Sequence, residues 1–187
     1  MEQNISSDEL VRLINGCLSG DRNSQKQIYQ VYGQNMMSLC LRYSKNREEA
    51  EEVLQDGFVN MYRRMNQFKN NGSFEGWLRK IMINCALQNY RRRKNSMINV
   101  VPINLDSSFP SREINLMDAI YEKELINLIQ SLPDTYRMVF NLYVFEGMKH
   151  REIAALLKIS EGTSKSNLFD ARLILKKHLS VELKIAR

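Results

Sequence analysis

The residues best suited to chemistry lie in the last third of the chain, and that chemistry is non-covalent. Cationic, hydroxyl, acidic and aromatic side chains recur there at close spacing. Cations neutralise phosphates, whereas hydroxyl, carboxylate and apolar groups contact base edges in the major groove of DNA. We therefore predict that this segment binds DNA, through Lys165, Ser166, Phe169, Asp170, Arg172 and Lys176.

A helix-turn-helix is the element that would position these side chains. Apolar residues predict a short helix over about 149–158, and residues 159–162 then break the period. Ser160 is a suitable N-cap for the helix that follows. The inward stripe of that second helix is Ser164, Leu168, Ala171, Leu175 and Leu179, at spacings of three and four.

A helical hairpin with a merely solvated outer face would show much of the same pattern. Phe169 and Leu173 lie opposite the inward stripe, and apolar residues on an outer face favour a partner surface. Asp170 is an acidic residue on the same face. A carboxylate near phosphates is repelled, so Asp170 either accepts a hydrogen bond from a cytosine amino group or pairs with Arg172 or Lys177.

Composition limits the remaining possibilities. A chain of 187 residues can form one large domain or two small ones, and its net charge of +6 favours an anionic partner. Glycine and proline are scarce and the apolar spacing is helical, which predicts an all-α fold. The sequence has no membrane-spanning run and no export signal at its start, so we expect a cytoplasmic protein without direct membrane insertion.

Metal, disulfide and cofactor chemistry find no support in the sequence. The three cysteines, Cys17, Cys40 and Cys85, are widely separated within apolar helical patterns, as expected for buried thiols. His150 and His178 have no histidine or cysteine at ligand spacing. We predict no cofactor and no metal. Nucleophile-elbow and phosphate-loop motifs are also missing, which predicts that the chain is not an enzyme.

The pattern divides the chain into two small helical domains joined by a flexible linker, with the helix-turn-helix in the second. Residues 1–94 form the first domain, with helices over about 7–20, 24–43, 47–67 and 74–94. Ser7 to Glu9 can cap its first helix, and Ser73 its fourth. Prolines and serines interrupt residues 95–115, which predicts the linker, although a short strand over 100–105 also fits. Residues 116–187 form the second domain.

Two oppositely charged helices characterise the first domain. The third helix begins with a run of glutamates, and the fourth ends with Arg91 to Lys94. Each run also has a purely structural explanation. Acidic residues at the start of a helix and basic residues at its end are solvated and interact favourably with the helix dipole. Aromatic residues among the cations favour nucleic-acid binding: Phe68, Phe74, Trp77 and Tyr90. For Trp77 a core position is favoured over base stacking.

Three motifs follow one another in a fixed order. They are REEAEEVLQDGFV over 47–59, GSFEGWLRKIMIN over 72–84, and the set SLP (131–133), EIA (152–154) and EGTSKS (161–166). In this order, and across nearly the whole chain, they resemble the extracytoplasmic-function group of bacterial RNA polymerase sigma factors, in the sigma-70 superfamily. The resemblance implies sigma domain 2 at 1–94 and sigma domain 4 at 116–187.

The resemblance also implies a role for particular residues. The acidic helix would bind the β′ clamp helices of core RNA polymerase, with the β subunit as a further contact, through Glu51, Glu52, Gln55 and Asp56. The −10 element would be recognised and melted by Lys69, Asn71, Ser73, Phe74, Asn84, Gln88, Arg91 and Arg92. In the second domain Glu161 and Thr163 would join the residues that read the −35 element.

Some positions depart from the family pattern and bear on promoter sequence. The family often has a basic residue where this chain has Asn167 and Asp170, commonly aspartate where it has Gln88, and usually valine where it has Ser164. An anti-sigma factor is a further partner that the resemblance allows. The alternative is a stand-alone helix-turn-helix transcriptional regulator that does not depend on core polymerase, for which an N-terminal receiver domain would require βα units.

Overall fold

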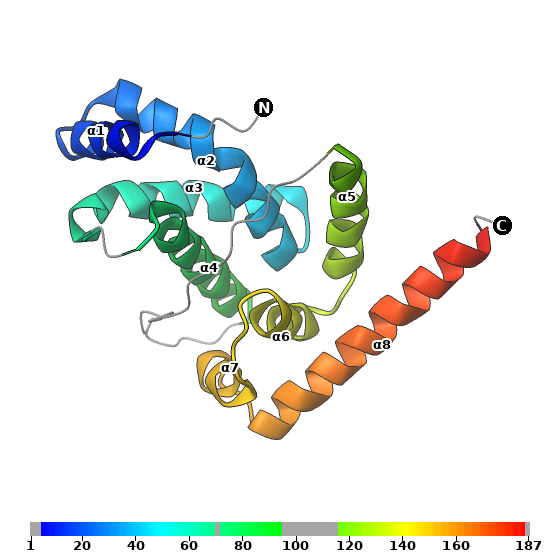
Figure 1. Ribbon diagram of the computed structural model, residues 1–187. Coiled ribbons are helices and arrows are strands. Elements are labelled where there is room, and N and C mark those ends of the chain that lie inside the picture. Colours follow the sequence, from blue (N-terminus) through cyan, green and yellow to red (C-terminus); the bar gives the residue numbers. More distant parts are fainter. Residues whose placement is uncertain (1–4, 70–71, 95–115, 186–187) are drawn as a thin grey trace. The chain divides into compact units, whose positions relative to one another are not determined.

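The computed structural model describes residues 5–69, 72–94 and 116–185, with side chains in the last range described for 123–179. All regular elements in these ranges are helical, namely eight α-helices and one 3-10 helix, which confirms the all-α fold class (Figure 1). The chain divides into two compact units. One comprises Met1–Cys40 and Arg47–Pro102, and the other Leu41–Asn46 and Ile103–Arg187.

The first unit holds three α-helices, the 3-10 helix and most of a fourth α-helix, α2, whose last three residues belong to the other unit. Their bounds are α1 Ser7–Leu18, α2 Arg22–Tyr43, α3 Arg47–Arg63, η1 Met65–Gln67 and α4 Phe74–Arg93. Ser6, and not Ser7, caps α1, because its hydroxyl accepts a hydrogen bond from the Glu9 amide at 3.2 Å. The predicted cap of α4 is confirmed, since the Ser73 hydroxyl accepts from the Gly76 amide at 3.0 Å.

Helices α3 and α4 cross at the centre of this unit (Figure 1). The third predicted helix extended to about residue 67, but α3 ends at Arg63 and the chain continues into η1. The inward side of α3 includes Ala50 and Met61, both fully buried. Helix α4 buries residues around much of its circumference, as expected for a helix that crosses the middle of a bundle.

The second unit contains α5 Leu116–Gln130, α6 Asp134–Val144, α7 His150–Leu157 and α8 Glu161–Ile185. Helices α7 and α8 form the predicted helix-turn-helix. Lys158 ends α7 in the left-handed conformation, with a φ of 53°, so the chain reverses within a few residues. The Ser160 hydroxyl then accepts from the Thr163 amide at 2.9 Å, which confirms it as the cap of α8.

The inward stripe of α8 is confirmed over three turns. Ser164, Leu168, Ala171 and Leu175 are buried, but Leu179 is 48% exposed, so the stripe ends one turn earlier than predicted. The three cysteines are buried and free, as predicted. The linker and its alternative strand lie outside the described residues. Among the residues that are described, no helix is both long and apolar enough to cross a bilayer.

Candidate functional site

The acidic residues of α3 are presented to solvent. Glu51, Glu52, Gln55 and Asp56 are all exposed. They occupy consecutive turns on the side of α3 away from its buried stripe, because residues three and four apart share a helix face. Arg47, one turn before Glu51, pairs with it at 2.8 Å. The four predicted residues therefore share one polar surface, and Glu51 is partly neutralised.

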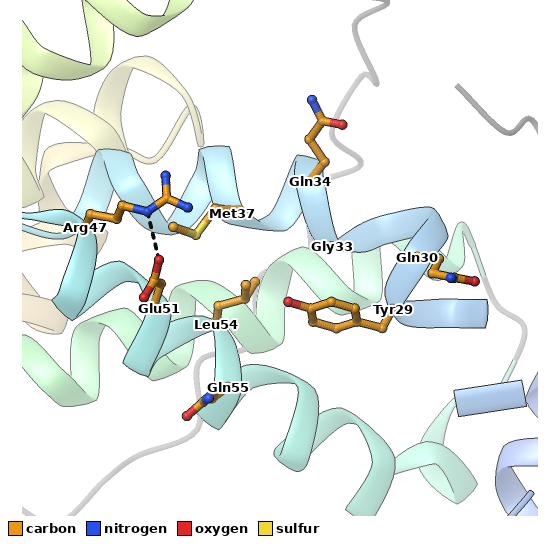
Figure 2. Close-up of a pocket in the computed structure, with 9 residues that line it drawn as sticks. All are labelled: Tyr29, Gln30, Gly33, Gln34, Met37, Arg47, Glu51, Leu54 and Gln55. Carbon is orange, nitrogen blue, oxygen red and sulfur yellow. Dashed lines mark hydrogen bonds and ion pairs between the residues drawn. The ribbon is translucent and has the colours of Figure 1, made fainter. Parts of the chain in front are cut away.

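A groove of about 430 Å³ adjoins this surface, between α2 and α3 (Figure 2). Tyr29, Gly33 and Met37 line it from α2, and Leu54 and Gln55 from α3. Tyr29 is 49% exposed although its ring packs against that of Phe58, at an interplanar angle of 57°. The site residues predicted from the sequence include none of those that line the groove from α2. The sequence signal for that side of the groove is one aromatic residue, Tyr29, which lies outside the buried side of α2 formed by residues such as Ile28 and Tyr32.

Ion pairs connect α3 with the basic end of α4. Glu49 is only 7% exposed and pairs with Arg93 at 2.7 Å. Asp56 pairs with Arg92 at 3.2 Å, with both side chains more than half exposed. Asp56 and Arg92 were predicted to serve different partners, polymerase and DNA. The structure brings them together, so neither charge is entirely available to an external partner.

Three further predicted residues share one face of α4. Asn84, Gln88 and Arg91 follow at spacings of four and three, and each is half-buried. Burial lowers the pKa of the Arg91 guanidinium from its ordinary value. A guanidinium stays charged despite such a shift, so this face presents one fixed cation beside two amides.

The loop before α4 is supported by an aromatic cluster. Phe68 and Phe74 meet edge to face with centroids 5.3 Å apart, and Trp77 lies within 5.7 Å of both. Phe74 is only 2% exposed and Tyr90 only 3%, so neither presents a stacking surface for bases. The predicted DNA contact by the Phe74 side chain is therefore corrected to a core position.

The remaining predicted residues of this loop are placed as follows. Lys69 and Ser73 are exposed, and Ser73 caps α4 through its hydroxyl. Asn71 lies outside the described residues. Gly72 adopts a φ of +116°, where an L-residue would be strained, so the entry to α4 depends on a glycine.

The outer face of α8 combines apolar and polar groups. Phe169 is 68% exposed and Leu173 58%. Ser166, Lys165, Arg172 and Lys176 are exposed around them. Lys165 pairs with Glu161 in the first turn at 2.8 Å, and this pairing lowers the pKa of the Glu161 carboxyl. Large apolar side chains left in solvent at the centre of a cationic face are typical of a binding surface.

A second group of contacts fixes α8 against the two preceding helices. The Tyr143 ring stacks on His150 at 4.7 Å, and the Arg172 guanidinium lies 5.7 Å from the Tyr143 centroid. His150 Nδ1 and the buried Ser164 hydroxyl are 2.9 Å apart. The sequence prediction contains neither Tyr143 nor His150 in this role. The sequence gives little sign of this contact, because Tyr143, His150 and Arg172 come from three different helices.

Comparison with known proteins matches each of the two units to a protein family. The family described as "Sigma-70 region 2" matches residues 28–96, and the family described as "Sigma-70, region 4" matches residues 122–175. The chain belongs to the sigma-70 family. Its similarity to extracytoplasmic-function members extends over almost the whole sequence.

Three relatives illustrate this similarity. The sigma factor SigW of Bacillus subtilis is 29% identical, over 86% of this chain and 91% of the relative. The sigma-H factor of Pseudomonas aeruginosa is 27% identical over 97% and 100%, and the sigma-E factor of Escherichia coli K12 is 28% identical over 92% and 93%. This sigma factor is therefore an extracytoplasmic-function member, and the predicted resemblance is confirmed.

Two solved structures are also similar to this chain. CnrH in complex with the cytosolic domain of CnrY matches with a TM-score of 0.46 and 20% identity, over 90% of this chain and 96% of that one. The sigma factor RpoE of Bartonella quintana, in complex with the anti-sigma factor NepR, matches with a TM-score of 0.47 and 20% identity, over 83% and 96%.

Family membership establishes the activity. A sigma factor binds core RNA polymerase and directs transcription initiation at promoters, and it belongs to a family of non-enzymatic initiation factors. The alternative of a stand-alone regulator is not favoured, because the family match includes the first unit as well as the helix-turn-helix. The described helices of that first unit, α1 to α4, also lack the βα units of a receiver domain.

Proposed function

We propose that the two units of this sigma factor divide polymerase binding and promoter recognition among three helices. Helix α3 holds core polymerase, α4 with its preceding loop opens the −10 element, and α8 reads the −35 element. The observation that carries this proposal is the exposure of an acidic face on α3 and of a cationic, apolar-centred face on α8. The two surfaces suit partners of opposite charge.

The polymerase contact is centred on Glu52 and Gln55. Both are exposed, and the carboxylate of Glu52 forms no ion pair with another described residue. The clamp helices of the β′ subunit would lie along α3, and the α2–α3 groove beside Gln55 can receive an apolar side chain from them. A buried apolar anchor beside a charged rim is the usual arrangement of a specific interface.

The melting step requires no catalytic residue. Unstacking a base step costs a few kcal/mol, and contacts with an extruded base offset that cost. Asn84, Gln88 and Arg91 supply amide groups and a cation on one face of α4. Lys69 and Ser73 lie in the loop that leads into it, where exposed polar groups can contact the opened strand. The buried Phe74 positions this loop.

Reading of the −35 element rests on the first half of α8. Ser166 and Phe169 reach base edges, and Arg172 and Lys176 neutralise phosphates at the side of the groove. Glu161 holds the ammonium of Lys165 in the first turn. Thr163 is exposed in the same turn, and its amide is already bonded to Ser160. The cation–π contact of Arg172 with Tyr143 helps to orient the helix in the groove.

The sigma factor acts where core polymerase and the chromosome are found, which places its activity in the cytoplasm. An anti-sigma factor would silence it by covering one of the surfaces described above. The acidic α3 face and the apolar centre of the α8 face are the two surfaces whose occupation would block polymerase or promoter binding.

Core binding tests the proposal. Replacing Glu52 with lysine should weaken co-purification with core polymerase at least about tenfold, because the reversed charge opposes a basic partner. The matched control is Glu9→Lys, the same charge reversal at an exposed position of α1. Equal retention of core by both variants and the unaltered protein would remove α3 from the interface.

A further inference from the structure

Asp170 differs from the other carboxylates of the helix-turn-helix whose side chains the structure describes. Glu152 accepts a hydrogen bond from the Lys149 amide at 2.7 Å, and Glu161 pairs with Lys165 at 2.8 Å. Asp170, half-buried in the middle of α8, has neither an ion pair nor a hydrogen bond among the residues that the structure describes. Its charge is thus left for an external partner.

The register of α8 explains why no cation reaches Asp170. Residues three and four positions away share its side of the helix, and none of them is cationic: Ser166, Asn167, Leu173 and Ile174. Arg172 is two positions away, which places it about 200° around the helix, and its guanidinium lies over Tyr143 instead. Lys177 is about 10 Å further along the axis. The intrahelical ion pair that the sequence allowed is therefore not formed.

The surroundings of Asp170 belong to the surface that faces DNA in the proposed function. Phe169 precedes it with 68% exposure, and Ser166 and Leu173 are exposed one turn away on either side. Asn167, three residues before Asp170, is only 7% exposed and belongs to the core. Asp170 is consequently the one acidic group on the exposed central part of α8 between residues 166 and 177.

Base chemistry decides what such a carboxylate can bind. Phosphates repel it, and the N7 and O6 acceptors of guanine do as well. Adenine offers an amino donor, but its N7 acceptor lies directly beside that donor. Cytosine presents its N4 amino donor in the major groove without an adjacent acceptor on the same base, and a carboxylate is its matching partner.

We infer that Asp170 is a specificity-determining residue that selects cytosine at one position of the −35 element, by accepting a hydrogen bond from the N4 amino group. This inference rests on the proposed role of α8 as the −35 reader and extends it to one base.

A promoter library tests the inference with intact holoenzyme. Core polymerase carrying the full-length sigma factor selects templates from a library with a randomised −35 element, and the bound sequences are counted. The variants are Asp170→Ala, Asp170→Asn and Asp170→Glu. The matched control is Lys176→Ala, which removes a proposed phosphate contact. It should weaken the binding of holoenzyme to all templates equally, without changing any base preference.

The expected result is a change at one position only. Asp170→Ala should reduce the cytosine preference there by about tenfold, equal to about 1.4 kcal/mol. Asp170→Asn should move the preference toward adenine, which a carboxamide binds through N6 and N7, and Asp170→Glu should retain cytosine.

Two outcomes separate the inference from the proposed function. If Asp170→Ala and Asp170→Asn strengthen binding to all templates equally, the carboxylate only repels DNA and the inference is overturned. If the unaltered holoenzyme shows no base preference anywhere in the −35 element, the proposed role of α8 is itself wrong, and the inference fails with it.

Discussion

Gly57 of α3 lies directly against Met82 of α4, so that a Cβ atom at residue 57 would overlap the Met82 sulfur. Met82 is fully buried, so its side chain would have to shift within a packed interior to admit a larger residue at position 57. The small residue therefore sets the separation between the helix proposed to hold polymerase and the helix proposed to open DNA. Close packing at this crossing fixes one surface relative to the other within the unit.

Enlarging residue 57 should disrupt this packing. We expect Gly57→Val to reduce the free energy of unfolding of the first unit by about 1–3 kcal/mol, the usual cost of overpacking. The fluorescence of Trp77, the single tryptophan of the chain, follows urea unfolding of this unit. In the double variant Gly57→Val with Met82→Ala, the loss of unfolding free energy should be smaller than the sum of the two single losses. The alanine makes room for the valine, and the valine fills part of the space that the methionine leaves.

Gly33 of α2 provides the control. A Cβ there would meet the Tyr29 ring at 3.5 Å, an ordinary contact, so Gly33→Val should change stability by less than about 1 kcal/mol. Strictly additive effects of Gly57→Val and Met82→Ala would contradict the close contact.

The two ion pairs between α3 and α4 should differ in their contribution to stability. Glu49 is nearly buried, whereas Asp56 is exposed to solvent. Glu49→Gln should destabilise the first unit by about 1–3 kcal/mol, because it leaves a partly buried cation with a weaker acceptor. Asp56→Asn should cost less than about 1 kcal/mol. Urea unfolding followed by Trp77 measures both, and equal losses would refute the distinction.

Promoter melting should depend on the α4 face. Replacing Asn84 and Arg91 with alanine should impair opening of duplex promoters at least about tenfold, yet matter less on a premelted bubble, where the unstacking cost is already met. Permanganate footprinting measures the open bases. Arg12→Ala, which removes an exposed cation from α1, is the control. Equal opening of the duplex by the double variant and the unaltered protein would exclude this face from melting.

Stability of the first unit should fall at high pH. Burial raises the pKa of Tyr62 to about 12, and its hydroxyl donates to the Gln25 carbonyl at 2.8 Å. The unfolded chain loses the same proton near pH 10, so the contribution of Tyr62 is complete below pH 10 and is lost as pH rises toward 12. Burial also raises the pKa of Tyr32 to about 12, so its contribution to stability is lost over the same pH range.

Tyr62→Phe isolates this contribution. The variant should be less stable at pH 8, because it lacks the hydrogen bond, but its stability should decline less steeply between pH 9 and 11. Unfolding curves at several pH values supply the two slopes. Parallel slopes would show that the Tyr62 hydroxyl does not titrate differently in the folded and unfolded chains.

Much of this architecture could be predicted from local patterns. The Ser73 and Ser160 caps and the inward stripe through Leu168 and Ala171 depend on residues within a turn of one another, and each is confirmed. Helix α6 is not singled out by the sequence pattern, because its buried residues include the polar Arg137 and Asn141.

Contacts between helices were harder to predict. The burial of Phe74, the pairing of Asp56 with Arg92 and the stack of Tyr143 on His150 each join residues that tertiary packing brings together. Aromatic and charged residues suit both a core and a nucleic-acid surface, so residue type alone does not distinguish the two. That is why the sequence prediction assigned Phe74 to the surface.

Run-off transcription with purified core RNA polymerase tests the central claim most directly. Genomic fragments from the organism that encodes the chain are transcribed with core alone, with the sigma factor alone, and with both. Discrete transcripts from a limited set of start sites should require both components, since the sigma factor supplies promoter recognition and core supplies catalysis. The account is contradicted if adding the chain leaves the transcripts of core polymerase unchanged, while the chain binds the same fragments without core.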